Sequence, residues 1–292
     1  MLPNLFVFGL GFSARVIAKA ALAQGWRVAG TTRTGEVVGE AQSSCHGLTV
    51  YPFDRDRDLP PQALDGVSHI LSSVPPDAGG DPVLDRLAAR LRQAAPHWVG
   101  YLSTTGVYGD CDGAWVDEAT PPNPSLERSC RRLAAEQNWL GSGLPVHLFR
   151  LAGIYGPGRS AIDSVRNGTA RRVVKPGQVF SRIHVDDIAQ VVLASAARPD
   201  PGAIYNVCDD DCAPPQQVVA HACALLGVAA PPEIPWELAQ NQLSPMALSF
   251  YADNKRVRND RIKTDLAVSL RYPSYRQGLA AILAAEKTSG LE

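Results

Sequence analysis

The sequence predicts an α/β fold, with a doubly wound parallel sheet followed by a smaller C-terminal lobe. Three observations favour this class. A glycine-rich turn follows the first apolar run, short apolar runs alternate with helical patterns as far as Arg150, and glycine, proline and loops increase beyond it. Alternating strands and helices are typical of a parallel sheet covered by helices on both faces. A Rossmann-like sheet is therefore expected.

The expected elements follow one another in a regular order. Short apolar runs predict strands at 5–8, 26–31, 48–51, 69–72, 99–102, 146–149 and 203–207. Helical patterns run from the first glycine turn to 23, then over 81–95, 125–140 and 183–197, the last beginning with a strand edge. Prolines between 214 and 245 punctuate short helices in the C-terminal part.

Composition and charge argue against several classes of protein, including nucleic-acid-binding and membrane proteins. Of 292 residues, 45% are hydrophobic and 20% charged, and the formal net charge is -1. No broad basic field predicts a nucleic-acid or anionic-membrane partner. The N-terminus lacks the basic region of a signal peptide, and no apolar run approaches the roughly 20 residues of a membrane span. Six scattered cysteines are typical of a reduced protein, so a cytoplasmic location is expected.

One group of cysteines raises the question of a metal site. Cys208 and Cys212 flank three aspartates, and His221 and Cys223 follow. Zinc is one interpretation. The other is an acidic turn followed by a helix with a buried cysteine. The spacing fits no standard zinc pattern, so no metal is expected.

The first glycine turn predicts a dinucleotide site. Gly9-x-Gly11-x-x-Ala14 follows a strand and opens a helix. Gly9 permits the tight turn, Gly11 lets the backbone approach a pyrophosphate, and Ala14 allows close packing of helix and strand. Phe12 and Ser13 lie at the helix N-terminus, where backbone N–H groups face the phosphates.

The end of the second strand indicates which dinucleotide binds. NAD sites usually place Asp or Glu there, to hold the ribose 2′-hydroxyl. Here Thr32 and Arg33 occupy the end, and a guanidinium suits a 2′-phosphate, so NADP is favoured over NAD. The alternative is that Arg33 is a solvated loop residue. Asp54 is a candidate for the adenine side or an ordinary turn residue, and the cofactor's middle should lie against Ser73, Val74 and Pro75.

Four further segments carry a family resemblance: Leu102 to Gly109, Arg150 to Gly158, Arg182 to Asp187, and Tyr205 to Val207. With the glycine turn, they resemble the extended short-chain dehydrogenase/reductases, the NAD-dependent epimerase/dehydratase group. The resemblance implies that residues 1–152 and 183–207 form an NADP-binding domain, with 153–182 and 208–292 as the substrate lobe. It implies that Ser103 and Thr104 lie at the nicotinamide, Thr104 as a catalytic residue. Helices 81–95 and 125–140 correspond to the family's dimer pair, which favours a homodimer.

The sequence departs from this family at its catalytic helix. In the active family, a tyrosine transfers a proton, and a lysine four residues later lowers its pKa. Aligning the segment from Leu133 to Gln137 places Arg128 and Arg132 at these positions. Arginine stays charged at any working pH, so Arg128 cannot act as the general acid. The chain therefore resembles an atypical member.

Candidates to replace the phenol are Tyr108, Tyr155 and His184, although each could instead pack the crevice or tie a loop. Four basic residues, Arg128, Arg132, Lys175 and Arg182, would make the crevice suit an anion if they converge. Tyr155, Lys175 and Arg182 are the substrate-side candidates. Separate surface charges are the alternative.

The resulting hypothesis is an NADP-dependent oxidoreductase that transfers a hydride to or from a small anionic molecule without the usual Tyr/Lys pair. One alternative is an NADP-binding sensor or scaffold without turnover, which the lost pair favours. Another is an epimerase-like enzyme acting on nucleotide sugars with a substituted acid/base. The retained Thr104 favours an enzyme.

Overall fold

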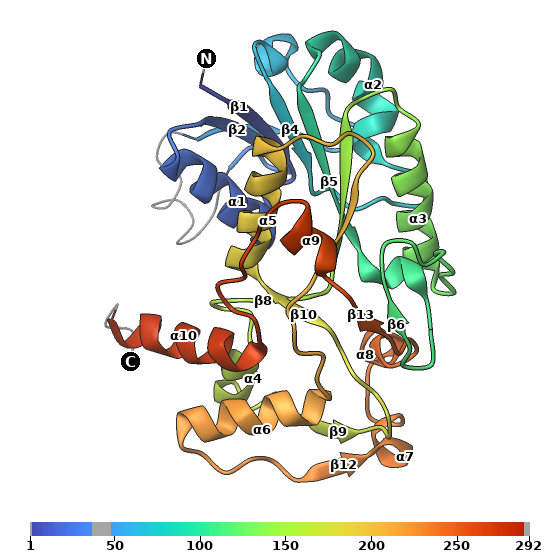
Figure 1. The fold of residues 1–292 in the computed structure, drawn as a ribbon, viewed down its shortest axis with the longest axis vertical. Helices are drawn as coiled ribbons and strands as arrows, with labels where there is room; N and C mark the ends of the chain where they lie inside the picture. The colour runs from blue at the N-terminus through green and yellow to red at the C-terminus, as the bar shows by residue number, and fades with distance from the viewer. Residues whose placement is uncertain (1, 37–47, 289–292) are drawn as a thin grey trace.

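The computed structural model describes residues 2–36 and 48–288. Across these residues, seven parallel strands form the central sheet in the order β11-β7-β5-β4-β1-β2-β3 (Figure 1). The strands are β1 (Asn4–Phe8), β2 (Arg27–Thr32), β3 (Thr49–Pro52), β4 (His69–Ser72), β5 (Trp98–Thr104), β7 (Val146–Leu151) and β11 (Ile204–Val207). The strand order reverses direction at β1 and β4, where doubly wound sheets bind ligands. The predicted fold class is confirmed.

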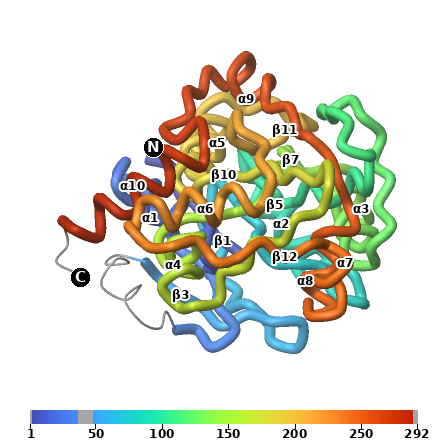
Figure 2. The backbone as a smooth tube through the Cα atoms, turned by 90° about the horizontal axis from the view of Figure 1, so that it is seen from below, coloured from blue at the N-terminus to red at the C-terminus, as the bar shows by residue number. Residues whose placement is uncertain are grey.

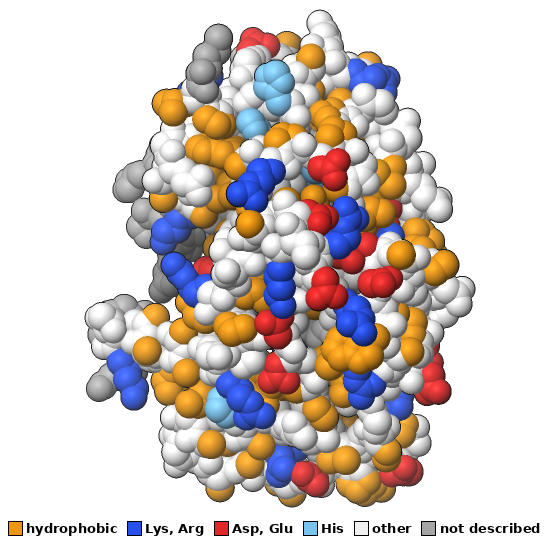
Figure 3. All heavy atoms as spheres, viewed as in Figure 1, with side chains coloured by type: hydrophobic (Ala, Val, Ile, Leu, Met, Phe, Trp, Pro, Cys, Tyr) orange, Lys and Arg blue, Asp and Glu red, His pale blue; other side chains and the backbone are white. Residues whose placement is uncertain are grey.

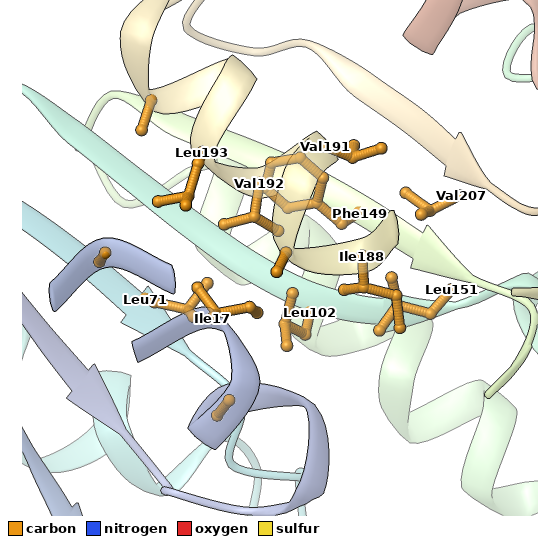
Figure 4. Packing of buried hydrophobic residues seen from close by; sticks show 14 of the residues in the cluster. Ile17, Leu71, Leu102, Phe149, Leu151, Ile188, Val191, Val192, Leu193 and Val207 are labelled. Carbon is orange, nitrogen blue, oxygen red and sulfur yellow. The ribbon is translucent and has the colours of Figure 1, made fainter. Parts of the chain in front are cut away.

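Two pairs of long helices cover the two faces of the sheet. They are α1 (Phe12–Ala23) with α5 (Val185–Ala197), and α2 (Pro82–Ala94) with α3 (Glu127–Leu140). Ile17 of α1 and Val192 of α5 pack with Phe149 of β7 in one buried cluster (Figure 4). Leu87 of α2 and Trp139 of α3 belong to a second cluster. Each strand therefore contributes side chains to both cores, as its alternating pleat requires.

A buried aspartate fixes the second helix pair. Asp81 caps α2, and its Oδ1 accepts hydrogen bonds from the backbone N–H groups of Val83 at 2.9 Å and Leu84 at 3.1 Å. Its Oδ2 accepts from Trp139 Nε1 at 2.9 Å, which connects α2 to α3. Pro82 takes the first helical position, where a missing N–H costs nothing.

A smaller lobe lies beyond the carboxyl ends of the strands (Figures 1 and 2). It contains the parallel pairs β8 (Gly153–Tyr155) with β10 (Arg182–His184) and β9 (Arg172–Val174) with β12 (Glu233–Pro235). Its helices are α4 (Ala161–Arg166), α6 (Pro215–Leu226), α7 (Trp236–Ala239), α8 (Pro245–Phe250) and α10 (Tyr275–Thr288). Ile162, Ala222 and Leu279 belong to a separate buried cluster there.

The segment after α8 returns to the sheet. β13 (Arg256–Val257) pairs with β6 (Trp115–Val116), and α9 (Asp260–Thr264) contacts β11. Ile262, Leu266 and Val268 join the buried cluster that contains α1 and α5. Part of the range 208–292, expected as substrate lobe, therefore packs with the core of the sheet. The segment just before β13 is held between the two parts of the molecule.

The surface shows no strong field of one sign on the face drawn in Figure 3, where basic and acidic side chains are interspersed. Within the described ranges, no helix has the length and apolar character needed to cross a membrane.

Candidate functional site

The glycine turn between β1 and α1 forms a cradle for a dinucleotide. Gly9 has a φ of +81°, which residues with a side chain rarely adopt. A Cβ built there would also meet Val74 Cγ2 at 3.0 Å, so both the backbone conformation and the available space favour glycine. A Cβ on Gly11 would meet no atom within 4 Å, which leaves open space above the start of α1. No side chain caps this helix. Its first N–H groups are thus available to a pyrophosphate, and the residues fit the predicted cofactor.

The neighbouring parts of the cradle lie along the sheet edge. Ser73 donates its backbone N–H to the carbonyl of Phe8 at 2.9 Å, which holds the loop after β4 beside the glycine turn. Ser13 and Ala14 are buried, whereas Pro75 is exposed. Cofactor contacts for these residues stay predictions.

Two guanidinium groups lie at the end of β2. Arg33 is exposed, and Arg57 Nη1 donates to the carbonyl oxygen of Arg33 at 3.3 Å. Thr32 Oγ1 accepts from the N–H of Gly35 at 2.9 Å and shapes the turn. Asp54 Oδ1 accepts from the N–H of Asp56 at 3.0 Å. This edge therefore carries positive charge beside the end of β2.

A cavity of about 570 Å³ opens where β5 ends, between the sheet and the smaller lobe. Five lining residues are basic: Arg128, Arg132, Arg159, Arg182 and Lys255. Asp253 is the acidic residue among those that line it. The other lining residues used below are Thr104, Gly106, Tyr155, Phe180, Ser249 and Phe250. Charge in this cavity favours an anionic ligand.

Thr104 is the last residue of β5 and caps the short 3₁₀ helix η4 (Thr105–Tyr108). Its Oγ1 accepts a hydrogen bond from the N–H of Gly106 at 3.1 Å. That contact uses a lone pair, and no acceptor among the described residues takes the hydroxyl proton. Thr104 can therefore donate a hydrogen bond to a ligand in the cavity.

The two arginines of α3 that line the cavity are held differently. Arg128 is exposed and reaches α8, where Nη1 donates to Ser249 Oγ at 2.5 Å and the guanidinium lies 5.0 Å from the centre of the Phe250 ring. Arg132 Nη1 donates to Tyr101 Oη and to the carbonyl of Leu102, both at 3.0 Å. Arg132 is thus anchored to β5, whereas Arg128 bridges the cavity to the lobe.

Tyr108 does not line the cavity. It is buried, donates to Asn206 Oδ1 at 2.8 Å, and accepts from Arg150 Nη1 at 3.0 Å. Arg150 Nη2 also binds Glu136 Oε2 at 2.8 Å, and Ser103 Oγ donates to Glu136 Oε1 at 2.5 Å. The hydroxyls of Tyr108 and Ser103 therefore belong to a buried network, and the predicted contacts of these side chains with a ligand have no support from this geometry.

Of the three residues predicted on the substrate side, Tyr155 and Arg182 line the cavity and Lys175 does not. Tyr155 lines the cavity, but its hydroxyl lies against Gly278, where a Cβ would approach it to 2.1 Å. Arg182 lines the cavity while Nη1 donates to the carbonyls of Phe180 at 2.8 Å and Ala213 at 3.0 Å. Lys175 Nζ donates to the carbonyl of Tyr251 at 2.5 Å and is not among the lining residues.

His184 is buried at the start of α5, where Nδ1 accepts from the N–H of Asp186 at 3.2 Å. Its ring packs 4.2 Å from the ring of Tyr272. Burial lowers the pKa of His184, so the neutral ring is favoured. His184 serves the fold of the lobe at this position.

Three charged cavity residues were not singled out from the sequence: Arg159, Asp253 and Lys255. Arg159 follows the glycine-rich segment after β8, and its guanidinium lies 5.5 Å from the centre of the Phe12 ring. This contact between Arg159 and Phe12 brings the segment after β8 next to the start of α1, which forms part of the cofactor cradle. Asp253 and Lys255 lie in a polar stretch before β13 that resembles an ordinary loop.

A buried carboxyl lies near this cavity. Burial raises the pKa of Asp209 to about 8, and its Oδ2 has no hydrogen-bond partner. The folded protein thus holds one more proton than the unfolded chain between pH of about 4 and about 8. Stability should fall as pH rises through this window, by up to about 1.4 kcal/mol per unit.

Asp209→Asn should remove this dependence. Urea unfolding at pH 5 and pH 8 is expected to show the variant gaining stability relative to the wild type at the higher pH. Asp56→Asn, at an exposed site, provides the matched control. Parallel pH profiles of Asp209→Asn and the wild type would mean that Asp209 titrates alike in both states.

Within the described residues, no group of three or more His, Cys, Asp or Glu could hold a metal ion. Cys208 is buried and donates to the carbonyl of Val257 at 3.2 Å, and Cys223 is buried on α6.

Two known proteins are similar to this chain over more than two thirds of its length. A conserved protein of unknown function from Silicibacter pomeroyi DSS has a solved structure with a TM-score of 0.89, 52% sequence identity, and coverage of 98% of this chain and 99% of that one. Protein YeeZ of Escherichia coli (strain K12) is 28% identical over 222 residues, 71% of this chain and 78% of YeeZ.

A third relative is the 3-diazoavenalumate denitrifying reductase of a Streptomyces species, 29% identical over 178 residues, or 56% of this chain and 58% of the reductase. The model of the NAD dependent epimerase/dehydratase family matches residues 83–208, which include β5, α3 and the cavity residues on them. Residues 83–208 of this chain, which has a seven-stranded parallel sheet and a dinucleotide cradle, therefore match the NAD-dependent epimerase/dehydratase family.

Proposed function

We propose that this protein is an NADP-dependent oxidoreductase that transfers a hydride between the nicotinamide and a small anionic molecule. The observation that carries the proposal is the cavity at the end of β5, where five basic side chains and one acidic side chain surround Thr104. A cavity of about 570 Å³ accommodates a small molecule. Similarity to a reductase supports the reaction class.

The chain's own residues have distinct tasks in this proposal. The bound cofactor supplies the hydride chemistry, and the protein supplies position and charge. Thr104 donates a hydrogen bond to the substrate oxygen on which negative charge develops. Arg128 and Arg159 bind the anionic part of the substrate. Arg132, anchored to β5, adds a fixed positive charge beside it.

Cofactor preference is the first prediction of this proposal. NADPH is expected to bind ten- to about a hundredfold more tightly than NADH, since a charge-assisted pair with Arg33 contributes about 1.5–3 kcal/mol. Arg33→Asp should abolish or reverse the preference, whereas Arg27→Asp, at the exposed start of the same strand, should leave it unchanged. Cofactor fluorescence titration measures this. Equal affinities in the wild type would contradict the 2′-phosphate assignment.

Substrate binding by Arg128 gives a second prediction. Arg128→Ala should raise KM about tenfold or more with a smaller change in kcat, because the lost interaction is present in the ground state as well as in the transition state. Arg131→Ala provides the control, since Arg131 lies on the same helix and pairs with Glu127. A fall in kcat at unchanged KM would instead assign Arg128 to the chemical step.

The proposal is tested by NADPH oxidation with paired substrates. Each keto acid or phosphorylated carbonyl compound is compared with its neutral ester or alcohol analogue. Turnover of the anionic member, with its neutral partner much poorer, is the expected result. Tight NADPH binding without turnover of any compound would favour the sensor or scaffold alternative. Preference for the neutral members would contradict the role of the basic cavity.

A further inference from the structure

The loss of the phenol leaves open which group gives the proton after hydride transfer. Of the tyrosines considered, Tyr108 lies outside the cavity, and the Tyr155 hydroxyl lies against α10. The arginines that line the cavity stay charged at working pH and cannot give up a proton. Among the lining residues whose side chains ionise, those that remain are then Lys255 and its neighbour Asp253.

Lys255 is held close to Thr104 by the same turn. Its Nζ donates to the carbonyl of Gly109 at 2.6 Å, and Gly109 ends the 3₁₀ helix that Thr104 begins. Thr104 and Lys255 both line the cavity at the end of β5. One small ligand can therefore contact both the Thr104 hydroxyl and the Lys255 ammonium.

The ammonium group has one N–H left for such a ligand. Asp253 Oδ2 lies 3.2 Å from Nζ, and Gly109 takes a second N–H. An ammonium has three. The Lys255 side chain is 11% exposed, so it is largely shielded from bulk water.

The segment that carries Lys255 is held by hydrogen bonds on both sides. The carbonyl of Asn254 accepts from the N–H groups of Cys111 and Gly113, both at 3.0 Å, on the sheet side. On the lobe side, Asn254 Oδ1 accepts from the N–H of Val179 at 3.1 Å. The carbonyl of Asp253 accepts from Gln178 Nε2 at 2.9 Å. Such support from two elements is what a proton donor needs to hold its position.

We propose that Lys255 supplies the proton in the reaction that replaces the family's tyrosine chemistry. This rests on the proposed function. A bound NADPH would supply the hydride: its nicotinamide C–H bond would break, the carbonyl carbon would gain the hydrogen with its electron pair, and the C=O π pair would pass to oxygen. The oxygen takes a proton from Lys255 Nζ, giving an alcohol, an oxidised nicotinamide and a neutral amine. The amine regains its proton from water. Asp253 is a positioning residue that holds the ammonium.

The first test needs no turnover. The chain has five lysines, Lys19, Lys175, Lys255, Lys263 and Lys287, so selective ¹³C labelling of lysine Cε gives few NMR signals. Inorganic phosphate is titrated into the NADP complex as a stand-in for the substrate anion. The Lys255 signal, assigned by its loss in Lys255→Arg, should shift with saturation, and the Lys19 signal should not. Saturable phosphate binding to the NADP complex, measured by calorimetry, without a shift of the Lys255 signal would overturn the proposal.

The second test uses the substrate found by NADPH oxidation. Lys255→Arg keeps the positive charge but removes the exchangeable ammonium, and single-turnover hydride transfer should slow about a hundredfold or more. NADPH affinity should stay within a fewfold of the wild type. Lys255→Ala should recover rate on addition of methylammonium, a response that a purely structural role would not produce. Lys19→Ala, at an exposed site on α1, should behave like the wild type.

The two proposals fail in different ways. If the wild type reduces a substrate and Lys255→Arg keeps the wild-type rate, Lys255 is not the donor, although the reductase proposal stands. Absence of methylammonium rescue in a folded Lys255→Ala variant with normal NADPH affinity would also contradict the assignment. If the wild type reduces nothing on the panel, the proposed function fails, and the Lys255 proposal fails with it.

Discussion

Replacement of Glu136 by Ala is expected to lower the free energy of unfolding by about 3–5 kcal/mol. The side chains of Arg150 and Glu136 are only 4% and 2% exposed, and they form an ion pair at 2.8 Å. Removal of the carboxylate leaves the Arg150 charge buried without its counterion. It also removes the acceptor of the Ser103 hydroxyl. The loss therefore combines an unpaired charge with an unsatisfied donor.

Chemical denaturation monitored by circular dichroism measures this difference. Glu127→Ala is the control, because Glu127 is exposed on the same helix and pairs with Arg131 four residues later, an arrangement that contributes about 0.3–0.5 kcal/mol. Similar losses in the two variants would show that the buried network does not hold α3 to the sheet.

Replacement of Thr104 by Val is expected to lower kcat about a hundred- to a thousandfold, with little change in KM or NADPH affinity. Valine keeps the branched shape but removes the hydroxyl that we place on the developing oxyanion. The N–H of Gly106 also loses its acceptor, so thermal unfolding of the variant must be compared first. Thr288→Val, at the exposed end of α10, is the matched control. A folded Thr104→Val enzyme with unchanged kcat would exclude the hydroxyl from the reaction.

Much of the fold follows from local patterns in the sequence. Apolar runs, helical periodicity and the glycine turn predicted the strands of the sheet and the helices that cover it, because each signal depends on neighbouring residues. The glycine turn also located the dinucleotide cradle. Gly9 has the positive φ that its place in the motif requires.

The side-chain positions at the site were harder to predict. Ser103 and Thr104 are adjacent on β5, and adjacent strand residues point to opposite faces, so both hydroxyls could not face one cavity. Thr104 lines the cavity, and Ser103 joins the buried network. Tyr108 follows one turn later and points to the same network. Sequence spacing alone did not show which of these side chains would point into the cavity and which into the buried network.

Lys255 was missed for another reason. It reaches the cavity because β13 pairs with β6, which lies far away along the chain. Such a pairing of two short segments has no periodic signal in the sequence. The same holds for Arg128 and α8, whose contact joins residues on opposite sides of the cavity.

Deuterium transfer from NADPH labelled at nicotinamide C4 tests the central claim most directly. The labelled cofactor is incubated with the paired panel of anionic and neutral carbonyl compounds, and the products are analysed by mass spectrometry. The account predicts one carbon-bound deuterium in the product of an anionic substrate, and little or none in the product of its neutral partner. Absence of deuterium from every product, while NADPH binds tightly, would contradict an oxidoreductase and assign this cavity to ligand binding alone.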